Sequence, residues 1–122
     1  MSQEESEALG GSGVRLFRGR ADERATPLGD VVNTLSGHVY ISVDLDIFDP
    51  SFMAAVGTPE PGGLGWYEVL RLLRQVAETR KIVGFDVVEL APREGPVACT
   101  YIAAKLVYKL IGYSIVLGSA AG

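Results

Sequence analysis

Three carboxylates in the chain have the residue types and spacing of a metal or cation site. Asp44 and Asp46 lie two residues apart in HVYISVDLDIF (38–48), and Glu89 lies near the end of KIVGFDVVEL (81–90). On one face of a strand such aspartates have α-carbons about 6–7 Å apart, so both can converge on a metal centre. Hard oxygen ligands favour Mg, Ca or Mn over zinc or copper.

Other interpretations of the Asp-x-Asp pattern exist. The aspartates can simply end a strand and cap loop N–H groups. A calcium loop beginning at Asp44 needs Gly at its sixth position and Glu at its twelfth, where this chain has Asp49 and Ala55. A dehalogenase-like phosphatase also begins with an apolar strand ending in Asp-x-Asp, but Phe48 replaces its usual Thr or Val. That phosphatase is a distant alternative.

The elements that would position the carboxylates alternate between strand and helix. Apolar and polar residues alternate over 38–48, which predicts a strand with one buried face. Helical spacing predicts a helix over 66–79. The apolar run over 81–90 predicts a strand that is buried on both faces and that ends near Glu89. Pro96 predicts the start of a final helix that runs to Ile111. Weaker patterns predict a strand over 14–17, a helix over 29–35 and a strand over 114–117. This order predicts an α/β unit with a parallel sheet, whose ligands bind beyond the carboxyl ends of the strands.

Composition and charge restrict the class of protein. The 122 residues are 48% hydrophobic and carry a net charge of −4 without a Lys/Arg run, which argues against a nucleic-acid partner. Cys99 is the only cysteine, so a reducing cytoplasm is expected, and near a helix start it should be a small buried residue rather than the nucleophile of a pair with His38. The late apolar run, 106–118, is interrupted by Lys109 and falls short of a membrane span.

The chain is expected to fold as one domain. Residues 1–13 are acidic and then rich in Gly and Ser, which predicts a flexible tail. The α/β domain is expected over 14–117, with a second short tail over 118–122. We therefore expect a globular, cytoplasmic protein without a membrane partner.

Three ordered motifs resemble the ureohydrolases, the family of arginase, agmatinase and formimidoylglutamase. They are SVDLDIFDP (42–50), GTPEPGGL (57–64) and GFDVVE (84–89), and the similarity extends over most of 38–112. The resemblance implies a three-layer α/β/α arginase-like fold with a parallel sheet. It also implies that this chain holds the C-terminal part of that fold.

The resemblance assigns roles to individual residues. It implies that Asp44 bridges two Mn(II) ions, that Asp46 binds one of them, and that Glu89 and Thr58 bind the substrate. Asp49 would hold the turn after the metal-bearing strand. The implied reaction is hydrolysis of a guanidino compound to urea and an amine, with agmatine favoured over arginine, which belongs to polyamine metabolism. The complete enzyme is expected to be a homo-oligomer.

Two further family motifs are absent from this sequence. The Gly-Gly-Asp-His and Asp-x-His-x-Asp segments supply the remaining metal ligands in the family, whereas His38 is the only histidine here. Two carboxylates alone make a weak, open site that cannot fix two ions. We therefore expect the chain by itself to be inactive. The alternative is a non-catalytic remnant or interaction domain derived from a ureohydrolase.

Overall fold

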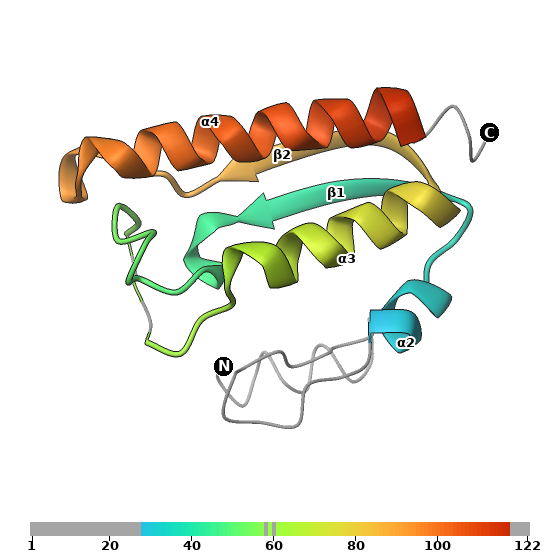
Figure 1. The fold of residues 1–122 in the computed structure, drawn as a ribbon, viewed down its shortest axis with the longest axis horizontal. Helices are drawn as coiled ribbons and strands as arrows, with labels where there is room; N and C mark the ends of the chain where they lie inside the picture. The colour runs from blue at the N-terminus through green and yellow to red at the C-terminus, as the bar shows by residue number, and fades with distance from the viewer. Residues whose placement is uncertain (1–27, 58, 60, 118–122) are drawn as a thin grey trace, which may run out of the picture.

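The computed structural model describes residues 28–57, 59 and 61–117 (Figure 1). Its helices are α2 (Leu28–Asn33), α3 (Trp66–Thr79) and α4 (Val97–Gly112), its strands β1 (His38–Asp44) and β2 (Lys81–Val88), and its short turns η1 (Leu45–Ile47), η2 (Pro92–Glu94) and η3 (Tyr113–Leu117). The predicted strand over 14–17 and both predicted tails lie outside the described residues. The helix over 66–79 is confirmed with the predicted bounds, and the expected short helix is α2.

β1 and β2 form a parallel pair connected by α3, which confirms the α/β prediction. The register pairs Val39 with Ile82 but Tyr40 with Gly84, so Val83 is an extra residue on β2. This one-residue bulge places Gly84 under the Tyr40 ring. A Cβ on Gly84 would lie 3.0 Å from two ring carbons, so the absent side chain makes room for the tyrosine.

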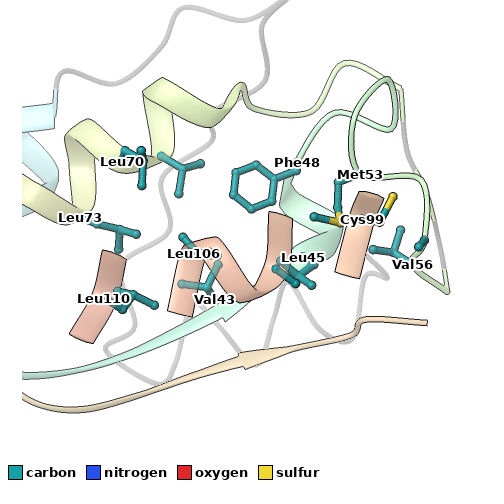
Figure 2. Close-up of a cluster of buried hydrophobic side chains, with 13 residues drawn as sticks. Val43, Leu45, Phe48, Met53, Val56, Leu70, Leu73, Cys99, Leu106 and Leu110 are labelled. Atoms are coloured by element: carbon teal, nitrogen blue, oxygen red, sulfur yellow. The ribbon is translucent and has the colours of Figure 1, made fainter. Parts of the chain in front are cut away.

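Both long helices pack on the same face of the sheet and form the main core with it. Figure 2 shows Leu70 and Leu73 of α3 and Leu106 and Leu110 of α4 gathered around Val43 of β1. Helical spacing places these leucines on one side of each helix, as the sequence predicted. Burying each such side chain contributes about 1.5–3 kcal/mol before entropy losses are subtracted.

The opposite face of the sheet is open in the described part of the chain. Tyr40 is 61% exposed there, and Ser42 on the same face is also exposed. The described residues thus form two of the three layers expected for an α/β/α fold. β2 was predicted to be buried on both faces, but Ile82 is its one buried residue.

Two predicted strand ends and one predicted strand are wrong. β1 ends at Asp44, and the next three residues turn into η1, so Ile47 is 44% exposed rather than on the buried face. β2 ends at Val88 rather than Leu90. The predicted strand over 114–117 is the π-helical turn η3, which continues α4. Its apolar run has the composition of a strand, and composition alone does not separate the two structures.

The last helical segment is longer than the sequence predicted. α4 and η3 together form one helical segment, Val97–Leu117, of 21 residues. The mean hydropathy of its most apolar part is 1.3, and 17% of that part is buried. Among the described residues this segment has the length and composition of a membrane span. Core helices of soluble proteins can have the same length and composition.

Candidate functional site

The two predicted site strands end at the same edge of the sheet. Asp44, the last residue of β1, is the register partner of Val88, the last residue of β2. Glu89 follows directly, so the register brings Asp44 and Glu89 to neighbouring positions at the carboxyl ends of the strands. That edge is where parallel α/β sheets bind ligands.

Asp46 does not lie on the strand, which corrects the expected geometry of the aspartate pair. It belongs to η1, and its backbone N–H donates a 2.8 Å hydrogen bond to Oδ1 of Asp44. Asp44 is exposed and caps this turn, whereas Asp46 is half-buried. The pair remains adjacent, but the tight turn rather than the two-residue pleat of a strand sets its geometry.

Glu89 has a strained backbone. Its φ is +73°, the single positive φ among the described non-glycine residues. L-residues pay about 1–2 kcal/mol for this left-handed region, and such strain concentrates at functional sites. The flanking Leu90 forms an antiparallel bridge to Val56, and the Ala91 N–H donates to the Ala55 carbonyl at 2.8 Å. Glu89 was expected to end a buried strand, but it is exposed and follows the strand.

Asp49 holds the turn after η1, as predicted. Its Oδ1 accepts the Ser51 N–H at 2.8 Å, and its own N–H donates to the Leu64 carbonyl at 3.0 Å. Hydrogen bonds from Ser51 hold the pKa of the Asp49 carboxyl below its ordinary value. Gly63 permits the close approach of the loop, because a Cβ there would lie 2.6 Å from the carbonyl carbon of Phe48.

Thr58, the second predicted substrate residue, lies outside the described residues. Its role therefore stays a prediction. His38 is exposed at the start of β1, and Asp44 is at the other end of that strand. Six residues of strand separate them by about 20 Å, too far for His38 to share a metal ion with Asp44. Cys99 is 2% exposed, which confirms that it is buried.

One polar network on the open sheet face was not identified from the sequence. Oδ1 of Asp86 accepts a 2.6 Å hydrogen bond from the Ser42 hydroxyl, and Oδ2 accepts one of 2.7 Å from the Tyr40 hydroxyl. These bonds, that from Ser42 first, lower the pKa of Asp86, and the pKa of Tyr40 is raised by the same partner. Alternation had placed Tyr40 and Ser42 on one face, but only the register shows that Asp86 faces them.

The described residues include the two carboxylates that were predicted to bind metal. Asp44 and Asp46 offer hard oxygen donors, which suit manganese. Among the described residues, however, no group of three or more His, Cys, Asp or Glu side chains could hold a metal ion. The described part of the chain therefore does not by itself fit a two-ion centre.

Comparison with known proteins places this geometry in a family. The sequence profile of the Arginase family matches residues 2–112. An N(1)-aminopropylagmatine ureohydrolase of Synechocystis is 42% identical over 113 residues, which are 91% of this chain and 37% of that protein. The agmatine ureohydrolase structure of Thermoplasma volcanium superposes with a TM-score of 0.63 at 39% identity, over 71% of this chain and 30% of that one. The arginase of Bacillus caldovelox superposes with a TM-score of 0.76 at 25% identity, over 91% and 40%.

The chain belongs to the arginase family, and its parallel sheet with packed helices is part of the arginase-like α/β fold. It is thus related to ureohydrolases that act on amidines. It spans about 37% of the length of the Synechocystis relative. The family assignment leaves the dehalogenase-like phosphatase without support.

Proposed function

We propose that this sequence serves a manganese-dependent hydrolase that converts a guanidino compound to urea and an amine. One observation carries the proposal: the register between Asp44 and Val88 brings Asp44 and Glu89 to the same edge of the sheet. The relatives named as ureohydrolases support the reaction class. In this proposal Asp44 binds the metal and Glu89 binds the cationic substrate.

Each carboxylate has a role in this proposal. Asp44 and Asp46 are metal ligands, and η1 holds them next to each other by the hydrogen bond between the Asp46 N–H and Asp44. Glu89 and Thr58 bind the substrate, Glu89 by charge-assisted hydrogen bonds to the planar guanidinium. The strained backbone of Glu89 fits a side chain that is aimed at a ligand rather than packed.

The favoured substrate is agmatine, with N1-aminopropylagmatine as a second candidate because the Synechocystis relative bears that name. Both compounds are purely cationic, whereas arginine also carries a carboxylate. The preference for these compounds rests on the relatives named for agmatine and its aminopropyl derivative.

The chain alone is proposed to be inactive, because its described residues do not complete a metal site. Complementing ligands have to come from a longer chain or from a partner chain. The non-catalytic remnant remains the alternative, and it makes a different prediction. A remnant chain placed in an intact relative should not restore the reaction.

A chimera separates the two possibilities. In it, the aligned 113 residues of the Synechocystis relative are replaced by the corresponding residues of this chain. We expect urea release from agmatine or N1-aminopropylagmatine that requires Mn(II), and no urea from the purified 122-residue chain. Asp46→Ala should abolish activity of the chimera. A folded chimera that releases no urea from any guanidino substrate would contradict the proposal and favour the remnant.

A further inference from the structure

Glu89 lies between two segments that are each paired with a different part of the chain. Before it, β2 is paired with β1 as far as Val88. After it, Leu90 forms an antiparallel bridge with Val56. The positive φ of Glu89, +73°, is therefore at the junction of these two pairings. Strain of this kind persists only where the surrounding structure over-determines the backbone, so the segments on both sides of Glu89 have to impose it.

Ala55 contacts both ends of the segment that follows Glu89. Its carbonyl accepts the Ala91 N–H at 2.8 Å. Gly95 approaches the same residue so closely that a Cβ on Gly95 would lie 2.8 Å from the Ala55 Cβ and 2.9 Å from its α-carbon and nitrogen. The η2 turn connects the two contacts. Both ends of segment 90–95 are therefore fixed against a single residue.

Position 95 requires a glycine for space rather than for backbone conformation. The φ of Gly95 is −165° and its ψ −175°, an extended conformation that any residue can adopt. The atoms that an added Cβ would meet include the backbone nitrogen and α-carbon of Ala55, which cannot rotate away as a flexible side chain can. A side chain at position 95 must therefore separate the segment from Ala55.

Ala55 belongs to the main core and is the fixed side of this contact. Ala55 and Met53 are 0% exposed and Val56 is 3% exposed. Figure 2 shows Met53 and Val56 grouped with Cys99 of α4 in that core. The residues of η2, by contrast, are exposed. Because close-packed interiors resist displacement, added bulk at this contact should move segment 90–95 rather than Ala55.

We propose that Ala55 and Gly95 are positioning residues for Glu89. Their close contact, together with the bridge between Leu90 and Val56, keeps the Glu89 backbone in its left-handed conformation and so fixes where the side chain leaves the chain. This hold on the backbone does not depend on the reaction. The further step, in which the fixed carboxylate meets a guanidinium, rests on the proposed function.

A double-mutant cycle in urea unfolding of the 122-residue chain tests the contact. In the unmodified chain, Glu89→Gly should lower the equilibrium constant for unfolding roughly fivefold, because glycine relieves the strain. With Gly95→Ala present, Glu89 can leave the left-handed region, and Glu89→Gly should no longer lower that constant, since glycine then only adds entropy to the unfolded chain.

Gly37→Ala is the matched control for this cycle. No atom lies within 4 Å of the Cβ that it adds, so the fivefold effect of Glu89→Gly should persist beside it. An equal effect of Glu89→Gly in all three backgrounds would overturn the inference.

A second measurement detects the Glu89 backbone directly and does not depend on stability. In NMR spectra, the backbone carbon shifts of Glu89 and the coupling between its amide and α-protons report φ. Gly95→Ala should move these signals toward extended values, and Gly37→Ala should not. Adding Ala55→Gly to Gly95→Ala should partly restore the native signals, because it removes the nearest of the three atoms that the new Cβ meets. Native Glu89 signals in the Gly95→Ala chain would contradict the proposed contact.

The consequence for the site is measured in the chimera. There Gly95→Ala should raise KM for the guanidino substrate roughly tenfold with a smaller change in kcat, because Glu89 would bind the guanidinium from a displaced position. Gly37→Ala should leave both constants unchanged. An active chimera whose KM does not respond to Gly95→Ala would rule out the positioning role. A chimera that releases no urea would instead contradict the proposed function, and the unfolding cycle would still decide whether Ala55 and Gly95 hold Glu89.

Discussion

Ser42 on β1 and Asp86 on β2 are register partners, and the Ser42 hydroxyl donates a 2.6 Å hydrogen bond to the Asp86 carboxylate. Tyr40 donates to the other oxygen of the same carboxylate. The network ties together two adjacent strands on the open face of the sheet, a short distance before Asp44 and Glu89.

The network predicts how Asp86 titrates. The pKa of Asp86 lies below its ordinary value of 3.8, so its ionised form contributes stability above the unfolded pKa. That contribution is lost as the pH falls through the folded pKa. Ser42→Ala with Tyr40→Phe should return the Asp86 pKa toward 3.8, measured by NMR titration. An unchanged Asp86 pKa would show that these hydroxyls do not cause the shift.

Two substitutions of Asp44 should separate its structural role from its proposed metal-binding role. Asp44→Asn keeps an oxygen that can accept the Asp46 N–H, so it should retain the cap of η1. Asp44→Ala should lose about 0.5–2 kcal/mol of stability in urea unfolding. Both variants of the chimera should lose Mn(II)-dependent urea release. An active Asp44→Asn chimera would argue against Asp44 as a metal ligand.

Glu89→Gly should raise stability while it removes function. Glycine adopts a φ of +73° without strain, so the variant should unfold at higher urea, by roughly 1 kcal/mol. In the chimera the same change should lower urea release, since the proposed guanidinium partner is lost. Glu94→Gly, where φ is not positive, should not be stabilised. Loss of stability in Glu89→Gly would mean that the Glu89 side chain supports the fold.

Gly63→Ala should disturb the loop that follows Asp49. Its Cβ would lie 2.6 Å from the backbone carbonyl of Phe48, and main-chain atoms cannot move aside as a flexible side chain can. We expect a loss of about 1–3 kcal/mol in urea unfolding. Gly57→Ala is the matched control, because no atom lies within 4 Å of its Cβ. Equal stability of both variants would show that the loop adapts.

Phe48→Ala should be the most destabilising of these substitutions. Phe48 is 1% exposed, and its ring meets Phe52 edge to face at 5.3 Å and Trp66 at 6.0 Å between centroids. We expect a loss of about 3–5 kcal/mol in urea unfolding. Val83→Ala on the open sheet should change stability by less than about 0.5 kcal/mol. A small effect at Phe48 would mean that the region around η1 repacks.

Much of the architecture was readable from the sequence because it follows periodicity. The helix over 66–79 has a regular apolar stripe and a Gly-rich segment before it, and the structure gives the same bounds. The strand ending at Asp44 was extended too far, because the buried Leu45 continues the alternation into η1. Periodicity indicates which side chains are buried, but a short turn such as η1 can bury a side chain in the same way as a strand does.

The site was only partly readable for a different reason. The sequence placed Asp44 near the end of a strand, but its cap on η1 depends on local backbone geometry. The left-handed conformation of Glu89 carries no residue signature, since such positions favour glycine. The hydrogen bond between Asp86 and Ser42 depends on the register between β1 and β2, which the sequence of either strand alone does not determine.

The extra residue at Val83 decides which side of the molecule the rest of β2 serves. Ile82 and Phe85 both pack with the helices although three positions separate them, an odd interval that a regular strand would divide between its faces. If Val83 were instead paired with Tyr40 in a regular ladder, Asp86 would lie opposite Val43, toward the apolar core, and Phe85 would turn toward solvent. Pairing β2 without this bulge would therefore exchange the buried and open faces for every residue of the strand after Val83.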